Sequence, residues 1–344
     1  MKVGIHLERY KKVSDFIKKY ELILKHNNID CEYLHITDED FFEKVKKLDA
    51  FIYRWYHYDY DRQLANTILP IIRNFLKIKC FPNEITDWHF DDKIKQYYLM
   101  KLYDFPMCKS WIFWDKNDAN KWADKAEYPL VFKLKGGASS QNVLLVKNKS
   151  KAKSLIRRMF GRGIKTFGII EAGSTFRSDF RLIRNLKIFL WKVKKKIEGQ
   201  PAETVYYKHK NYVLFQEFLP GNKFDTRVTV IGERAYAFRR FNRKNDFRSS
   251  GSGKIDNNPA EIDMECVRKA FEISEKLGFQ SMAYDFLYDK SSKIRFSEIS
   301  YSFVDRQPDN GVVYYRLTQT DYDGRNETFD PIAFNFNKAL SEDL

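Results

Sequence analysis

Strands and helices alternate through the first 90 residues, and this alternation limits the possible folds more than any other feature. Three short apolar runs have the composition of buried strands: Val3–Leu7, Cys31–Ile36 and Ala50–Trp55. Between and after them lie stretches with apolar residues three or four positions apart, such as Val13–Asn27 and Arg62–Leu76. Such alternation is typical of a parallel sheet with helices on its faces. We therefore predict an N-terminal α/β domain.

The composition is that of a folded chain. Of 344 residues, 43% are hydrophobic and 16% aromatic, which is enough to bury sizeable cores and excludes wholesale disorder. No apolar run approaches the roughly 18 residues of a membrane-spanning helix. The first residues, MKVGIHLERY, lack the apolar region of a signal peptide, and the four scattered cysteines form no CxxC pair. We expect a cytoplasmic protein, because single cysteines fit a reducing compartment.

The chain is strongly basic. It has 61 Lys and Arg against 46 Asp and Glu, a formal net charge of +15. Such a surface favours an anionic partner, which includes phosphates, acidic glycans and lipid headgroups. We do not expect nucleic acid, because the sequence has no helix-turn-helix, zinc-finger or RNA-recognition aromatic motif.

A lysine and a glycine-rich loop stand together in the middle of the chain. Lys133 interrupts the apolar strand predicted at Tyr128–Leu134, where a cation is costly unless it is paired or faces a ligand. A small, flexible loop follows and leads to a second strand at Val143–Val146, so we predict a hairpin. The loop offers backbone N–H groups that can cradle phosphate, at Gly136, Gly137, Ser139 and Ser140.

Two carboxylates occupy neighbouring strands later in the chain. Asp285 lies in AYDFLYD and Glu298 in RFSEIS, with the turn DKSSK between them. We predict a hairpin that points both carboxylates the same way. Paired carboxylates provide the hard oxygen ligands that Mg²⁺ prefers and leave coordination positions for phosphate. The alternative is two ordinary strand carboxylates that face solvent.

Further polar residues lie between these two features. The segment Gln216-Glu217-Phe218 ends an apolar strand and can present its backbone to a purine edge. Charged residues follow it in order: Asp225, Arg227, Arg240 and Arg248. Arginine suits a phosphoryl site because its planar guanidinium binds phosphate with two hydrogen bonds. Only one of the adjacent Arg239 and Arg240 can face inward in a regular strand, and we expect it to be Arg240.

The order of these residues resembles that of the ATP-grasp superfamily, from about Asp92 to Ser300. The resemblance implies that ATP is contacted by Lys93, in DDKIKQYYLMK, and by Lys133 with the glycine loop. It also implies that Glu217 and Phe218 frame the adenine and that Asp225 holds the ribose. The segment that would reach the phosphates is Arg248-Ser249-Ser250. Two alternatives stay open: Lys93 as a helix-surface lysine, and Asp225 as a turn cap.

The resemblance also implies Mg²⁺ on Asp285 and Glu298, with Mn²⁺ as a substitute. The family usually has an Asn as the third metal ligand, and this chain has Ser300 in its place. A serine hydroxyl is a weaker ligand, so the number of bound metal ions stays open.

From this resemblance we expect a mixed α/β and α+β fold. An N-terminal parallel-sheet domain (1–90) would precede a two-lobed ATP-grasp fold. The small lobe would span 91–212 and include a basic helical insertion, and the large lobe, with the metal site, would span 213–344.

The resemblance implies an ATP-dependent carboxylate–amine ligase that acts through an acyl phosphate. The closest similarity is to ribosomal-protein glutamate ligases, with a weaker one to ATP-grasp proteins of surface-polysaccharide pathways. The substrate could then be an acidic sugar or glycan precursor. Arg240 and Arg248 would be catalytic, stabilising charge on the transferring group. The alternatives are a phosphotransferase on the same fold and a nucleotide-binding module without turnover.

A basic segment, residues 181–196, contains seven cations and no acidic residue. Its apolar residues recur at helical spacing, with Trp191 among them. One interpretation is a helix packed on its domain with a solvated basic face. The other is a surface for an acidic glycan or for anionic lipid at the inner membrane face.

Overall fold

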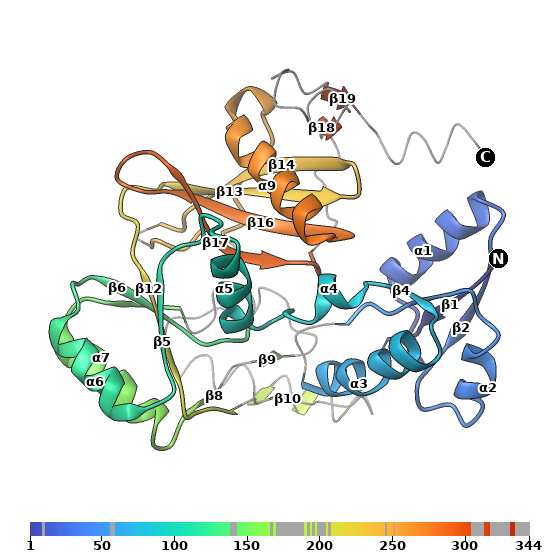
Figure 1. The fold of residues 1–344 in the computed structure, drawn as a ribbon, viewed down its shortest axis with the longest axis horizontal. Coiled ribbons are helices and arrows are strands. Elements are labelled where there is room, and N and C mark those ends of the chain that lie inside the picture. Colours follow the sequence, from blue (N-terminus) through green and yellow to red (C-terminus); the bar gives the residue numbers. More distant parts are fainter. Residues whose placement is uncertain are drawn as a thin grey trace.

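The structure is a computed structural model (Figure 1). It describes residues 1–8, 11–55, 59–137, 143–165, 168–169, 189–190, 193–194, 197, 204–205, 208–244, 246–250, 252–303, 313–316 and 331–333. Within these residues, no helix combines the length and apolar character needed to cross a bilayer.

The first 81 residues contain a four-stranded parallel sheet and its helices, as the alternation predicts. Its strands are β1 (Lys2–His6), β2 (Asp30–Leu34), β3 (Ala50–Ile52) and β4 (Lys79–Phe81), in the order β2-β1-β3-β4. The helices are α1 (Asp15–His26), α2 (Phe41–Val45) and α3 (Asp59–Pro70), which continues as a π-helical turn over Ile71–Phe75. Gly4 in β1 is closely packed, because a Cβ there would come within 2.4 Å of Leu48 Cδ1.

A four-stranded antiparallel sheet forms a second layer, in the order β5-β12-β6-β7. Its strands are β5 (Ser110–Phe113), β6 (Leu130–Lys133), β7 (Leu144–Val146) and β12 (Val213–Glu217). Helices α6 (Lys116–Lys125) and α7 (Lys149–Met159) pack with it around Phe132 and Phe215. The pairing of β6 with β7 confirms the predicted hairpin. Two small sheets pair β8 (Ile164–Lys165) with β11 (Lys208–His209), and β9 (Gly168–Ile169) with β10 (Thr204–Val205).

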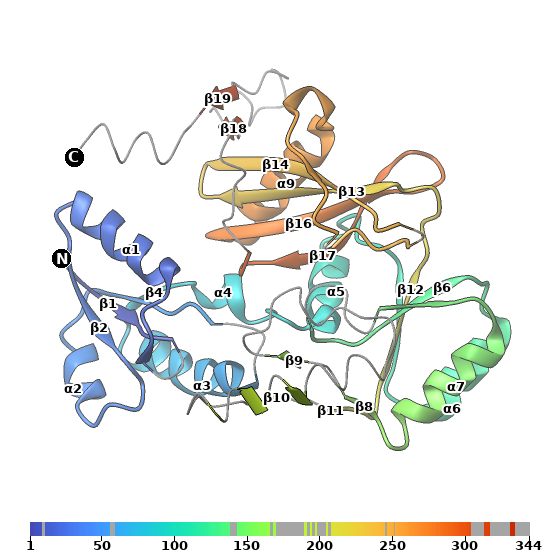
Figure 2. The same ribbon diagram turned by 180° about the vertical axis from the view of Figure 1, so that it is seen from behind.

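The largest sheet follows the order β17-β16-β13-β14-β18-β19, with β15 paired to β14. Its strands are β13 (Phe224–Ile231), β14 (Arg234–Phe241), β15 (Ile255–Asp256), β16 (Ser281–Tyr288), β17 (Ile294–Ser300), β18 (Val313–Arg316) and β19 (Pro331–Ala333). Helix α9 (Met264–Leu277) follows a 3-10 turn at Pro259–Glu261. Asp263 caps the start of α9, and Gly278 ends it with a left-handed φ of 67°. Its apolar face covers one side of the sheet (Figures 1 and 2).

The parallel sheet and the largest sheet share one hydrophobic core, whereas the β5-β12-β6-β7 sheet has its own. Polar contacts reinforce the shared core, since Tyr301 Oη lies 3.2 Å from both the N and the O of Trp55. The Gln280 side chain also accepts from the Asn83 N–H at 2.6 Å. Short helix α4 (Glu84–Asp87) and helix α5 (Lys93–Leu102) lie between the layers, with α5 against β17 (Figure 2). The domain limits at 90/91 and 212/213 stay predictions.

Several buried histidines, among them His6, His89 and His209, should make the fold sensitive to acid. Burial lowers the pKa of His6 and His89 to about 3 and that of His209 to about 4. The folded state therefore binds fewer protons than the unfolded chain below pH 6.5, so stability falls as pH decreases. Each histidine costs up to about 1.4 kcal/mol per pH unit.

We predict that the melting temperature decreases between pH 7 and pH 5, and that His89→Leu makes this decrease shallower. Calorimetry across this pH range measures both. The matched control is His26→Leu, at an exposed position on α1. Identical slopes for His89→Leu and the wild type would contradict the assignment.

Candidate active site

The face of the largest sheet opposite α9 carries a ladder of alternating charges. Arg227 on β13 donates from Nε and Nη2 to the two oxygens of Asp285 on β16, at 2.7 and 2.8 Å. Arg240 on β14 donates likewise to both oxygens of Asp225, at 2.7 Å each. Its Nη2 also lies 2.8 Å from Asp285 Oδ2. The two acids and two bases thus compensate one another in a buried setting.

Strand register explains why these four residues meet. Arg227 pairs directly with Asp285, and Asp225 with Arg240, so each pair shares one face of the sheet. Arg239 points to the opposite face, where it contacts Asp256 and Glu261. The strand alternation therefore turns Arg240 inward, as expected, and Asp225 is not a turn cap.

The arginines determine the charge of Asp285. Burial alone would raise the pKa of this carboxyl, but Arg227 and Arg240 outweigh burial and hold the pKa well below its usual range. Asp285 is therefore ionised at every physiological pH. Its side chain is only 10% exposed, which excludes the alternative of a solvent-facing strand carboxylate.

A β-bulge brings the second carboxylate onto the same face. Phe286 pairs with Phe296 but the next residue, Asp285, pairs with Glu298, so Ser297 is the extra residue. The insertion shifts the alternation of β17, which buries Phe296 and Ile299 while Glu298 stands beside Asp285. Without the bulge, Glu298 would point into the core.

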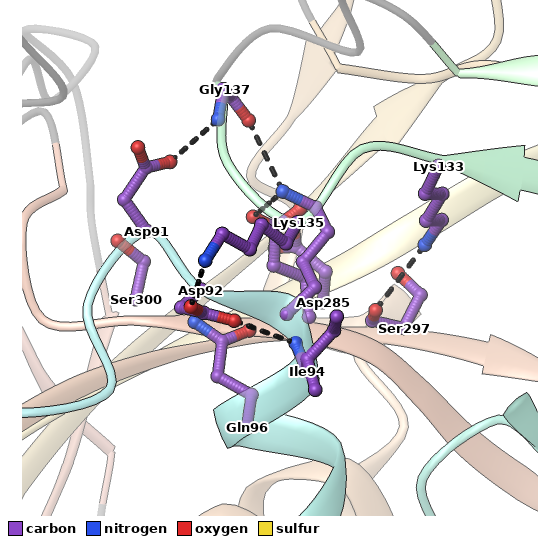
Figure 3. A network of polar contacts seen from close by, with 12 residues as sticks. Asp91, Asp92, Ile94, Gln96, Lys133, Lys135, Gly137, Asp285, Ser297 and Ser300 are labelled. Atoms are coloured by element: carbon purple, nitrogen blue, oxygen red, sulfur yellow. Dashed lines mark hydrogen bonds and ion pairs between the residues drawn. The ribbon is translucent and has the colours of Figure 1, made fainter. Parts of the chain in front are cut away.

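Two lysines approach these carboxylates from the other layer. Lys93, the first residue of α5, places Nζ 3.0 Å from Glu298 Oε1. Lys133, the last residue of β6, donates to the Ser297 carbonyl at 3.4 Å (Figure 3). The bulge thus offers both a carboxylate and a carbonyl to cations from the neighbouring layer.

The two lysines are both buried but differ in their electrostatics. Burial would lower the pKa of the Lys93 ammonium, but the carboxylates of Glu298 and Asp91 outweigh it, and its pKa is raised. At Lys133, burial prevails over the attraction of Glu298 and lowers the pKa. Lys93 is 6% exposed, so it is not a helix-surface lysine. An anion near Lys133 would raise the pKa of the Lys133 ammonium again and so favour its charged form.

The start of the glycine loop is fixed by the segment that begins α5 (Figure 3). The Gly137 N–H donates to Asp91 Oδ1 at 2.7 Å, and Lys93 Nζ donates to the Gly137 carbonyl at 3.1 Å. Asp92 caps α5 by accepting from the N–H groups of Ile94 and Lys95. Sequence reasoning missed Asp91, although its place directly before the Asp92–Lys93 pair could have indicated it.

The remaining predicted residues make their contacts with residues outside this cluster. The Glu217 carboxylate accepts from the Lys109 N–H at 2.7 Å, and Phe218 packs edge-on against Phe247. The Arg248 guanidinium is paired with Asp246 at 2.6 Å. Ser249 is buried and donates to Asn242, whereas the Ser250 carbonyl accepts from Arg243. Ser139 and Ser140 lie outside the described residues.

The donor set fits Mg²⁺ that is held together with phosphate. Asp285 and Glu298 supply adjacent hard oxygens, and Asp285 Oδ1 accepts only one of the three guanidinium contacts. Ser300 is less suited, because its hydroxyl donates to the Ser302 carbonyl at 3.0 Å. Among the described residues no three His, Cys, Asp or Glu side chains gather as a metal cluster. Two carboxylates alone leave most of the six positions of Mg²⁺ to phosphate and water.

Comparison with known proteins settles the fold. No protein-family model and no curated protein matches the sequence. Among the solved structures that are similar to this chain, three match it over most of their length at 12–13% identity. An ATP-grasp RimK domain protein from Sphaerobacter thermophilus has a TM-score of 0.50 and covers 87% of this chain and 90% of its own. For D-alanine–D-alanine ligase from Bacillus anthracis complexed with ATP, the values are 0.51, 88% and 86%.

The third structure, the ATP-grasp ligase PsnB with a precursor peptide and AMPPNP, has a TM-score of 0.51 and covers 88% of this chain and 90% of its own. The chain has an ATP-grasp fold. The expected combination of a parallel sheet with antiparallel sheets is thereby confirmed, and the resemblance carried by Lys93, Lys133 and Asp285 correctly identified the superfamily fold.

The charge ladder should also support the ATP-grasp fold itself. We predict that Asp285→Ala lowers the free energy of unfolding by about 3–5 kcal/mol, because it leaves two buried guanidinium groups without this partner. Urea denaturation measures the change. Asp124→Ala breaks exposed ion pairs with Lys149 and Lys153, which water and salt screen, and should lower the free energy of unfolding much less. Equal losses for the two variants would contradict the role of the ladder.

Proposed function

We propose that this protein is an ATP-dependent carboxylate–amine ligase that acts through an acyl phosphate. The observation that carries the proposal is the meeting of two layers at β17. Lys93 and Lys133 come from the side of the glycine loop, and Asp285 and Glu298 come from the largest sheet. Two buried lysines thus face a buried carboxylate, Asp285, and a partly exposed one, Glu298, an arrangement that suits a polyanion with its metal ion.

In this proposal the triphosphate lies between the layers. The triphosphate oxygens are bound by Lys93 and Lys133. They are also bound by backbone N–H groups of the glycine loop, including the N–H groups of Ser139 and Ser140. Glu217 and Phe218 stand at the end of β12 to frame the adenine, and Asp225 is the candidate for the ribose. Arg240 already donates to both carboxylate oxygens of Asp225. The ribose hydroxyls would therefore have to share these oxygens with Arg240 or replace it.

Asp285 and Glu298 would hold Mg²⁺ or Mn²⁺, which when bound neutralises charge on the phosphate oxygens. The γ-phosphoryl group moves to a substrate carboxylate: the bond to ADP breaks and a new P–O bond forms. An amine then attacks the acyl carbon, a C–N bond forms, and inorganic phosphate leaves with loss of a proton from the amine. Arg240, with Arg248 and the Arg248-Ser249-Ser250 segment, would stabilise the developing negative charge.

The substrates are proposed from charge alone. A net charge of +15 favours acidic substrates, and an acidic sugar or glycan precursor of surface polysaccharides fits that chemistry. A screen of uronic acids and amino acids for ADP release tests this. Release that requires both a carboxylate and an amine supports a ligase, whereas release without an amine would indicate a phosphotransferase.

One observation favours a second candidate, a module that binds nucleotide without turnover. Ser300 replaces an amide ligand, and its hydroxyl is engaged by the Ser302 carbonyl. Binding of ATP without metal-dependent ADP formation under any substrate pair would favour this candidate.

We predict that Lys133→Ala and Glu298→Ala each abolish ADP formation, because each removes a charge that would face the nucleotide or its metal ion. Both variants should keep the wild-type circular dichroism spectrum. Lys101→Ala, at an exposed position in the last turn of α5, is the control and should be fully active. Wild-type turnover in either site variant would count against the proposed site.

We also propose that the basic segment binds an anionic membrane surface, as a cytoplasmic protein could do at the inner membrane face. Four apolar side chains are exposed at helical positions, by 62, 56, 41 and 81%: Phe189, Leu190, Val193 and Ile197. Their spacing confines them to about 100° of a helix circumference. The positive charge of the segment is inferred from the sequence alone, because most of its lysines lie outside the described residues. Trp191 lies outside them as well.

This proposal predicts flotation of the protein with vesicles that contain anionic lipid but not with neutral vesicles. A Phe189→Ser, Leu190→Ser double variant should lose flotation, because it removes apolar surface and leaves every charge in place. Flotation with neutral vesicles, or none with either kind, would contradict it. Displacement of vesicles by an acidic glycan would identify the glycan as the partner.

A further inference from the structure

Three separate parts of the chain meet at Asp91. Its Oδ1 accepts from the Gly137 N–H at 2.7 Å, and its Oδ2 accepts from Arg62 Nη1 at 3.2 Å. Arg62 lies on α3 of the N-terminal layer, whereas Gly137 is the second residue of the glycine loop in the neighbouring layer. The Asp91 side chain is 3% exposed and that of Arg62 is 18% exposed. Burial of this kind requires a carboxylate to have partners, and Asp91 has one of them in the loop.

The loop backbone is packed directly onto this carboxylate. A Cβ on Gly136 would lie 3.0 Å from Asp91 Oδ2, 3.1 Å from the Asp91 carbonyl and 3.3 Å from Arg62 Nη1. Gly137 has a φ of 107°, which other residues rarely adopt. A glycine at each position therefore lets the main chain approach Asp91 and turn there.

Both polar groups of Gly137 are held by the same short segment. Asp91 accepts from its N–H, and Lys93 Nζ donates to its carbonyl at 3.1 Å. The Lys93 N–H also donates to the Lys135 carbonyl at 2.8 Å, and Lys135 Nζ lies 3.5 Å from Asp92 (Figure 3). The direction of the loop is thus determined where it leaves β6.

We propose that Asp91 is a positioning residue that holds Gly136 and Gly137, at the start of the glycine loop, in place for binding a phosphate group, and that Arg62 fixes Asp91 from the N-terminal layer. Asp91 does not itself contact the nucleotide. It acts through Gly137, and Arg62 balances the carboxylate charge that would otherwise repel a phosphate. This inference rests on the proposed nucleotide binding, but the anchoring of the loop is independent of any ligand.

The first test measures hydrogen exchange of the peptide that spans residues 134–142, without nucleotide. Asp91→Ala should increase exchange at the Gly137 amide at least 10-fold, because its acceptor is lost. Asp91→Asn keeps an acceptor oxygen and should stay within 3-fold of the wild type. Unchanged exchange in Asp91→Ala overturns the anchoring, whether or not the protein binds ATP.

The second test measures the Kd of AMPPNP by calorimetry on folded variants. Asp91→Ala should weaken binding at least 10-fold, Asp91→Asn should restore most of it, and Arg62→Ala should weaken it less than Asp91→Ala. Asp87→Asn is the matched control, because Asp87 is also buried and paired with an arginine, at 2.6 Å from Arg73. That variant should lose stability without a change in Kd.

The outcomes separate the inference from the proposed function. If the wild type fails to bind AMPPNP, the proposed function and the phosphate role of the loop both fail, while exchange still decides the anchoring. If the wild type binds but Asp91→Ala binds equally well, Asp91 has no positioning role. If Asp91→Asn is as weak as Asp91→Ala, the hydrogen bond to Gly137 is not what matters, and the proposal is likewise overturned.

Discussion

The compensation of buried charge across strands β13, β14 and β16 is the interaction on which the rest of the site depends. A carboxylate such as Asp285 can remain ionised inside the fold only because Arg227 and Arg240 donate to it. The same arginines are anchored by strand register and, for Arg240, by Asp225. Because every charge in the ladder has a partner, one face of the largest sheet can be polar while its other face is apolar and covered by α9. This rigid surface is the platform that Lys93 and Lys133 approach.

The arrangement of the two hydrophobic cores has a consequence for motion. The parallel sheet and the largest sheet share a core, so separating them would expose large apolar side chains such as Phe51 and Phe286. The layer that carries the glycine loop has a core of its own and meets β17 through polar contacts such as those of Lys133 and Lys93. Polar contacts can be exchanged for water at small net cost. Any opening that admits a nucleotide is therefore expected at this boundary.

Much of the architecture could be predicted from periodicity. The N-terminal alternation of strands and helices, the β6–β7 hairpin and the β16–β17 hairpin all depend on local patterns and turns. The contacts of the site could not be predicted in this way. A strict alternation through RFSEIS places Phe296 and Glu298 on one face, yet Ser297 is an inserted residue that separates them. The three-residue spacing of Phe296 and Ile299 is the only local trace of the bulge, and two residues are too few to distinguish it from noise. The ion pair of Arg62 with Asp91 joins positions 29 residues apart and leaves no periodic pattern at all.

Ser300 shows how the donor set links metal and nucleotide in the proposed reaction. Two carboxylates bind Mg²⁺ weakly when one of them, Asp285, is already neutralised by two guanidinium groups. A third protein ligand would raise the affinity, but the Ser300 hydroxyl is committed to the Ser302 carbonyl. Phosphate oxygens must then supply the missing ligands, and a triphosphate also offers the arginines an alternative anion. In the proposed function, metal ion and nucleotide would therefore be taken up together, and the buried charges would be redistributed between Asp285 and the phosphates rather than left unpaired.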